Sequence, residues 1–205
     1  MIPRYWLIAA LLALLSGCAT LPHPLPGTGN GGAALWPAQR DQLQRITHFE
    51  LQARIASGGV MGITKGDLHW QQNADGSFAL RVSGPFGVGA ASISGNAQLV
   101  EVRTRDGVFP TTDPQQWLQQ RMGWTLPVAG LRWWVLGLPA PDSAAQLSYN
   151  PDGTLATLQQ DGWQLDYTEY LAADGYTLPR KLQLSGKDAT LKVVIDQWQN
   201  LPPRQ

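Results

Sequence analysis

Apolar and polar residues alternate along most of the chain, as they do in β-strands that bury one face. The alternation is clear over residues 49–55, where Phe49, Leu51 and Ile55 share one face. Strands are predicted at residues 49–55, 66–72, 78–82, 91–94 and 98–103, around Val108, and at residues 146–149, 155–160, 163–170, 178–184 and 191–198. Short turns, many of them Asp-Gly, separate these runs and predict hairpins, so the pairing should be antiparallel.

Three segments interrupt the alternation and predict helices at residues 36–48, 113–122 and 127–136. Asp113 suits the N-cap of the second helix, and Pro114 suits its first helical position. Three helices are too few to cover both faces of a parallel sheet. The pattern therefore predicts a mainly β fold, whose sheet either closes into a barrel or curls and is covered by helices.

The N-terminus has the layout of a secretory signal, because Arg4 precedes an apolar run over residues 6–15. This run is too short to cross a membrane as a helix, which takes roughly 20 apolar residues. Leu15-Ser16-Gly17-Cys18 closes the run and resembles the bacterial lipobox. The resemblance implies that residues 1–17 are a signal peptide and that Cys18 becomes the lipidated N-terminal residue. In the alternative, an ordinary signal peptide, Cys18 would be a free thiol, since the chain holds no second cysteine.

Residues 18–35 are predicted to be the lipidated cysteine and a flexible tether, because prolines and glycines dominate this stretch and no apolar period appears. Residues 36–205 are then one domain. Ala19 follows the cysteine where an aspartate often marks inner-membrane retention in enterobacterial lipoproteins. The presence of alanine rather than aspartate at position 19 favours the outer membrane.

Composition and motifs exclude several classes of function. Basic and acidic residues number 15 each, and no basic cluster is present, so nucleic acid is not an expected partner. Residues 27–32 match G-x-G-x-x-G formally, but they follow no strand and open no helix, so no nucleotide site is expected. No catalytic motif is present. We therefore expect neither an enzyme nor a bound cofactor.

Titratable residues are also too scattered to suggest a site. The three histidines, His23, His48 and His69, have no metal-ligand spacing, so no metal is predicted. The acids Asp161, Asp166 and Glu169 lie near one another on a predicted hairpin. Acids in that setting more often form a solvated face than an acid–base pair, and we predict the former.

The segment Gly130–Pro139, with the sequence GLRWWVLGLP, resembles the L-R-x-W-[IVL]-x-G-x-P run of the LolB family of outer-membrane lipoproteins. Gly84-Pro85-Phe86-Gly87 is similar to the N-P-L-G loop of that family, with phenylalanine where leucine is usual. The final strand, residues 191–198, is similar too. The resemblance covers about residues 36–198.

The resemblance implies a single incomplete antiparallel β-barrel of about 11 strands, with helices over its mouth and an apolar cavity. It also implies a receptor on the periplasmic face of the outer membrane of a Gram-negative bacterium. Such a receptor accepts acylated lipoproteins from the periplasmic carrier LolA and inserts them into the outer membrane. The expected partners are therefore LolA, the acyl chains of cargo lipoproteins and outer-membrane lipid, and the chain itself is expected to be a monomer.

The candidate cavity lining is the set of apolar residues on the buried strand faces and the adjacent tryptophans of the third helix. These are Leu51, Ile55, Leu68, Trp70, Leu80, Val82, Trp133, Trp134, Trp163, Leu165, Leu191, Val193 and Ile195. Periodicity alone does not separate a cavity lining from a filled core. The alternative is therefore an envelope scaffold lipoprotein with a filled core and no lipid ligand.

More specific predictions concern two smaller groups of residues, the loop at residues 85–87 and the adjacent tryptophans of the third helix. Pro85, Phe86 and Gly87 form a predicted loop with an apolar side chain at its tip. That side chain either folds back on its own sheet or enters a bilayer surface, and the resemblance favours the second. Adjacent helix residues point about 100° apart, so one of Trp133 and Trp134 should pack on the sheet while the other lines the cavity mouth. The pattern does not say which does which.

Overall fold

The computed structural model describes residues 30–59, 62–85, 90–96 and 99–204. Within them, one antiparallel sheet of 11 strands follows the order β6-β5-β4-β3-β2-β1-β11-β10-β9-β8-β7. The strands are β1 (Phe49–Gly59), β2 (Gly62–Gln72), β3 (Phe78–Ser83), β4 (Ala91–Gly95), β5 (Val100–Thr104), β6 (Gly107–Thr111), β7 (Gln146–Tyr149), β8 (Leu155–Gln160), β9 (Trp163–Ala173), β10 (Tyr176–Ser185) and β11 (Thr190–Gln199). Three helices accompany it in the described residues: α2 (Asn30–Leu43), α3 (Pro114–Met122) and α4 (Val128–Trp134).

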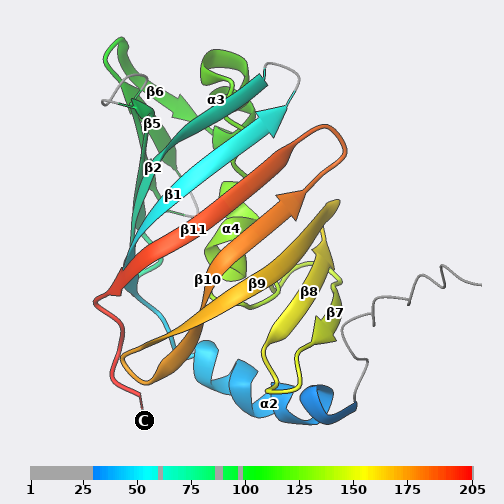
Figure 1. Ribbon diagram of the computed structural model, residues 1–205. Coiled ribbons are helices and arrows are strands. Elements are labelled where there is room, and N and C mark those ends of the chain that lie inside the picture. Colours follow the sequence, from blue (N-terminus) through cyan, green and yellow to red (C-terminus); the bar gives the residue numbers. More distant parts are fainter. Residues whose placement is uncertain (1–29, 60–61, 86–89, 97–98, 205) are drawn as a thin grey trace, which may run out of the picture.

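The sheet curls strongly but does not close, because β6 and β7 remain its two edges (Figure 1). β1 and β11 pair in the middle and join the two halves of the chain. Helix α4 lies on the concave side of the curled sheet, α3 lies near β5, and α2 runs below β7 and β8 (Figure 1). The prediction of an unclosed antiparallel sheet of about 11 strands with helices is confirmed.

The hairpin turns have the backbone that their sequence predicts. Asp161 and Gly162 have φ of 51° and 76°, and Asp174 and Gly175 have φ of 47° and 83°. Two successive left-handed residues make the tight turn whose twist matches that of the flanking strands. Because Asp tolerates this conformation and Gly prefers it, these dipeptides set the register of β8–β9 and β9–β10.

Helix α2 differs from the sequence prediction at both ends. It spans Asn30–Leu43 rather than residues 36–48, so it begins inside the segment predicted to be a tether. A Cβ on Gly32 would lie 2.0 Å from the carbonyl oxygen of Asn150, so only glycine lets the helix approach the β7–β8 turn this closely. Glycine's poor helix propensity suggested a tether, but this tertiary contact outweighs it.

The segment between β6 and β7 crosses the concave side of the sheet. Helix α3 starts as predicted, with the Asp113 carboxylate accepting a hydrogen bond of 2.9 Å from the backbone N–H of Gln116. It ends at Gly123, which is left-handed with φ of 70°. Helix α4 follows and is shorter than the predicted residues 127–136, since the chain turns after Trp134.

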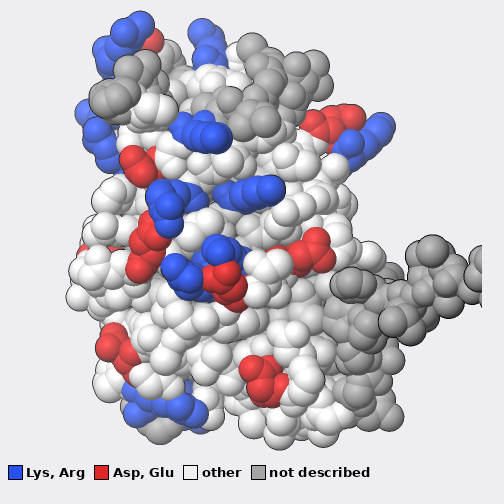
Figure 2. Space-filling model, viewed as in Figure 1, with Lys and Arg blue, Asp and Glu red and all other residues white. Residues whose placement is uncertain are grey.

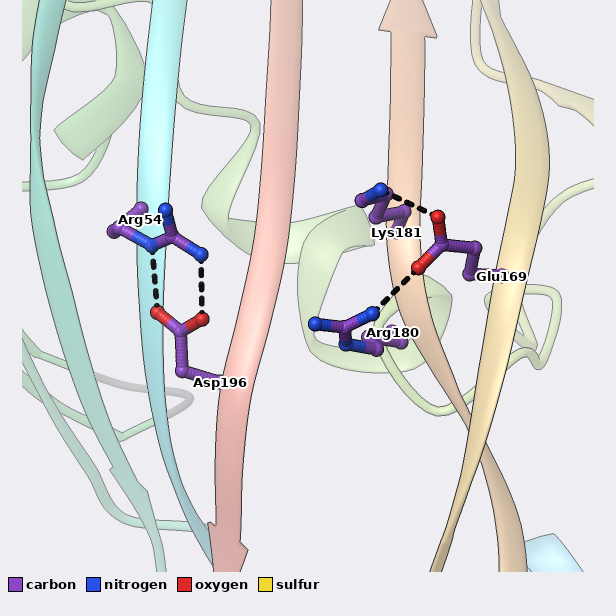
Figure 3. Close-up of polar contacts among 5 residues, drawn as sticks. All are labelled: Arg54, Glu169, Arg180, Lys181 and Asp196. Carbon is purple, nitrogen blue, oxygen red and sulfur yellow. Dashed lines mark hydrogen bonds and ion pairs between the residues drawn. The ribbon is translucent and has the colours of Figure 1, made fainter.

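The outer face of the sheet carries mixed charges (Figure 2). Arg54 on β1 and Asp196 on β11 form a bidentate pair with distances of 2.9 and 2.7 Å, and Glu169 on β9 contacts both Arg180 and Lys181 on β10 (Figure 3). The hydrogen bond from Arg54 lowers the pKa of Asp196. Because these groups remain substantially exposed, water and salt screen the pairs and their contribution to stability is small.

Candidate functional site

The concave side of the sheet is apolar, as the alternation predicted. Rows of inward side chains run across the strands: Leu51 pairs with Trp198 and Trp70, and Trp70 pairs with Leu80. The buried members of the predicted lining are Leu51, Ile55, Leu68, Trp70, Leu80, Val82, Trp134, Leu165, Leu191, Val193 and Ile195. Trp133 and Trp163 are only partly buried.

The segment containing α3 and α4 supplies the opposite wall of this interior. Its buried residues Leu118, Trp124, Leu126 and Leu131 belong to the same apolar cluster as the strand residues. None of these four residues was among the predicted lining, although the mostly apolar stretch at residues 124–128 contains Trp124 and Leu126. The interior therefore consists of two apolar layers, one from the sheet and one from the α3–α4 segment.

Trp134 is the central residue of the α3–α4 layer, and its position is fixed by several contacts. Its side chain is 1% exposed, and its Nε1 donates a hydrogen bond of 2.9 Å to Oε1 of Gln160 on β8. The Tyr167 hydroxyl donates to the backbone carbonyl of Trp134 at 3.0 Å. Burial raises the pKa of Tyr167, so this hydroxyl keeps its proton. A Cβ on Gly130 would lie 2.4 Å from the indole, so glycine is needed there.

Trp133 packs against the core but remains partly exposed. The Arg132 guanidinium lies 5.2 Å from the centroid of its ring, a distance suited to a cation–π contact. Partial burial lowers the pKa of Arg132. Of the two adjacent tryptophans, Trp134 is therefore the one that packs against the sheet.

A second group of aromatic residues lies where β1 begins and β11 ends. We call Phe49, Trp70, Phe78 and Trp198 the aromatic cluster. The Phe49 ring centroid is 6.1 Å from that of Trp70 and 5.4 Å from that of Trp198. Both tryptophan Nε1 atoms are buried, and neither has a hydrogen-bond partner within the described part of the chain.

Several predicted site residues lie at or beyond the limits of the described chain. Pro85 is exposed just after β3, whereas Phe86 and Gly87 fall outside the described residues. Cys18 and residues 19–29 of the predicted tether also fall outside the described residues. The described residues contain no group of three or more His, Cys, Asp or Glu that could hold a metal ion. None of the helices α2, α3 and α4 is long and apolar enough to cross a membrane.

Solved structures with a similar fold define the structural class. A LolA superfamily protein from Nitrosomonas europaea matches with a TM-score of 0.56 at 8% identity, over 84% of this chain and 95% of that protein. A DUF1329 family protein from Desulfovibrio piger matches with a TM-score of 0.51 at 9% identity, over 84% and 91%. The chain therefore shares its fold, an open and curled antiparallel sheet with helices, with these two proteins.

Sequence comparison narrows this class to one family. Residues 47–198 match the model of the family described as outer membrane lipoprotein LolB. The chain is 40% identical to the outer-membrane lipoprotein LolB of Pseudomonas paraeruginosa, over 98% of this chain and 97% of that protein. It is 38% identical to that of Pseudomonas syringae pv. syringae, over 96% of each. The chain belongs to the LolB family: it is a lipoprotein-sorting outer-membrane lipoprotein and not an enzyme.

Proposed function

We propose that this protein accepts acylated lipoproteins from the periplasmic carrier LolA and inserts them into the outer membrane from its periplasmic face. The observation that carries the proposal is the family match over residues 47–198, which contain most of the sheet and the α3–α4 segment. The two-layered apolar interior supports it, because an acyl chain needs apolar surroundings along its length. The acyl chains of the cargo are the ligand in this proposal.

The physical requirement for transfer is to keep acyl chains out of water. Exposing one methylene costs about 0.8 kcal/mol, so a chain of about 16 carbons would cost on the order of 10 kcal/mol. Passage from one apolar interior to another avoids this cost. An acyl chain that enters between the sheet and the α3–α4 segment gives up apolar contacts with the carrier and gains apolar contacts with this protein. The transfer then requires no nucleotide, provided that affinity rises towards the bilayer.

The proposed function also requires that the protein be attached to the membrane, which we assign to acyl chains on Cys18. Three acyl chains on Cys18 would hold the protein on the membrane far more firmly than a single chain, which anchors only marginally. Residues 19–29 would then connect the anchor to helix α2 and let the domain reach both the carrier and the bilayer. A monomer suffices for this role, because the interior is built from one chain.

The alternative is an envelope scaffold lipoprotein with a filled core. It is favoured by one observation, the close packing of Trp134 and Leu131 into the interior. The two functions differ in whether acyl chains enter the protein, and a transfer assay separates them.

The test follows a radiolabelled lipoprotein in two stages, first from loaded LolA to the mature chain carrying Cys18→Ala, and then from that chain to liposomes. We expect both stages to proceed without nucleotide. Failure of the first stage by a chain with a native circular dichroism spectrum would favour the scaffold function.

In the same assay, Phe86→Glu is expected to leave the first stage nearly unchanged and to slow the second stage by at least tenfold. An apolar loop tip gains free energy at the membrane interface, whereas a carboxylate resists desolvation there and is repelled by anionic headgroups. Phe86→Leu is the matched control and should behave as wild type. Loss of the first stage with the second preserved would instead place Phe86 at the LolA interface.

A further inference from the structure

We propose that Trp70 and Trp198 bind the carbonyl groups of the acylated ligand, each through its indole N–H, and that Gln72 accepts a hydrogen bond from the ligand's amide N–H. This inference rests on the proposed function and assigns a polar anchor within the apolar interior. It concerns the aromatic cluster and the neighbouring end of β2.

Both indole N–H groups are buried, and neither has a hydrogen-bond partner among the described residues. Trp70 is 2% exposed and Trp198 is 7% exposed, and Nε1 of each is shielded from solvent. A buried donor without an acceptor has lost its hydrogen bonds to water without replacement, so such groups rarely remain unpaired in native proteins. Trp134 shows the usual outcome, because its indole is bonded to Gln160. Two unpaired indoles around one phenylalanine therefore indicate a missing acceptor.

Gln72 adds an unpaired acceptor beside these donors. Its side chain is 2% exposed, and it lies two residues beyond Trp70 on the same face of β2. Its Nε2 donates to the backbone carbonyls of Asn73 and Ser77 at 3.3 and 3.1 Å. Because two carbonyl oxygens hold the nitrogen, the amide orientation is determined. The remaining Oε1 is buried and has no partner among the described residues.

This set of groups matches the chemistry of an acylated amino terminus. An N-acyl diacylglyceryl cysteine has two ester carbonyls and one amide carbonyl, which are acceptors, and one amide N–H, which is a donor. In the cluster, Leu51 separates Trp70 and Trp198 in register, so the strands that carry the two indoles are roughly 10 Å apart. Two separated donors suit a ligand with several carbonyl groups better than a single fatty acid.

A hollow in the surface borders the aromatic cluster at Phe49 and Gln72, although neither Trp70 nor Trp198 lines it. Its volume is about 440 Å³, and Phe49 and Gln72 line it together with His48, Asn73, Asn200 and Leu201. The polar lining suits the ester and amide region of the ligand. The apolar rows beyond the cluster, which begin with Leu51 and Leu80, suit the acyl chains.

The experiment compares two ligands that differ only in carbonyl groups: dipalmitoyl-glyceryl cysteine, an ester, and its dihexadecyl ether analogue. Each displaces a fluorescent apolar dye from the mature chain carrying Cys18→Ala. We expect wild type to prefer the ester, and each of Trp70→Phe and Trp198→Phe to reduce that preference about fivefold, the effect of one hydrogen bond of about 1 kcal/mol. Trp36→Phe is the matched control and should leave the ratio unchanged, because Trp36 lies on α2 against Tyr149 and outside the aromatic cluster.

Indole resonances supply a second measurement that needs no variant in the cluster. With ¹⁵N-labelled tryptophan, the Nε1–H signals of Trp70 and Trp198 should shift on adding the ester and remain in place with the ether. Equal affinity for ester and ether, with neither indole shifting, would overturn the anchor and leave buried water as the partner of these groups. If neither ligand displaces the dye from a folded chain, the proposed function itself fails.

Discussion

Trp134→Ala is expected to lower the free energy of unfolding by about 3–5 kcal/mol, the usual cost of removing a buried tryptophan. The side chain is 1% exposed and packs closely against Gly130. Its removal also takes one hydrogen bond from Gln160. That loss is partial, because Gln160 Oε1 still accepts from the backbone N–H of Ala140 at 2.8 Å.

The adjacent tryptophan provides the control for this prediction. Trp133 is partly exposed, and its ring contacts Arg132, so Trp133→Ala should cost only about 1 kcal/mol. Urea denaturation followed by circular dichroism measures both variants, and the midpoints should separate clearly while the slopes stay alike. Similar losses for the two variants would contradict the assignment of Trp134 as the residue that joins α4 to the sheet.

Cys18→Ala is expected to move nearly all of the protein from the outer membrane to the soluble periplasmic fraction. The acyl chains on the cysteine are the proposed attachment, and each buried methylene contributes about 0.8 kcal/mol. Cell fractionation with immunoblotting measures the distribution.

The same variant should remain folded, because Cys18 precedes helix α2 and the described core contains no cysteine. Its circular dichroism spectrum and urea midpoint should therefore equal those of the acylated protein. A Cys18→Ala protein that still fractionates with the outer membrane would refute the lipid-anchor assignment.

The hydrogen bonding within the aromatic cluster could not be predicted from the sequence. Alternation placed Trp70 on the buried face, and it did so correctly. It carried no information about hydrogen bonding, because the partner of a buried indole depends on side chains from other strands. The indole of Trp134 donates to Gln160, whereas that of Trp70, a similarly buried tryptophan, has no acceptor among the described residues.

The sequence by itself predicted most of the strands, their antiparallel pairing in hairpins and the resemblance to the family, because strand alternation, Asp-Gly turns and the segment at residues 130–139 are local signals. The pairing of β1 with β11 was not among these predictions. Tertiary structure alone decided the start of α2, which depends on Gly32 meeting Asn150, more than a hundred residues away. It also decided that Trp134 rather than Trp133 faces the sheet, through Gln160. These features arise from contacts between residues that are far apart in the chain. Helix propensity and hydrophobic periodicity depend only on neighbouring residues, so they do not report such contacts.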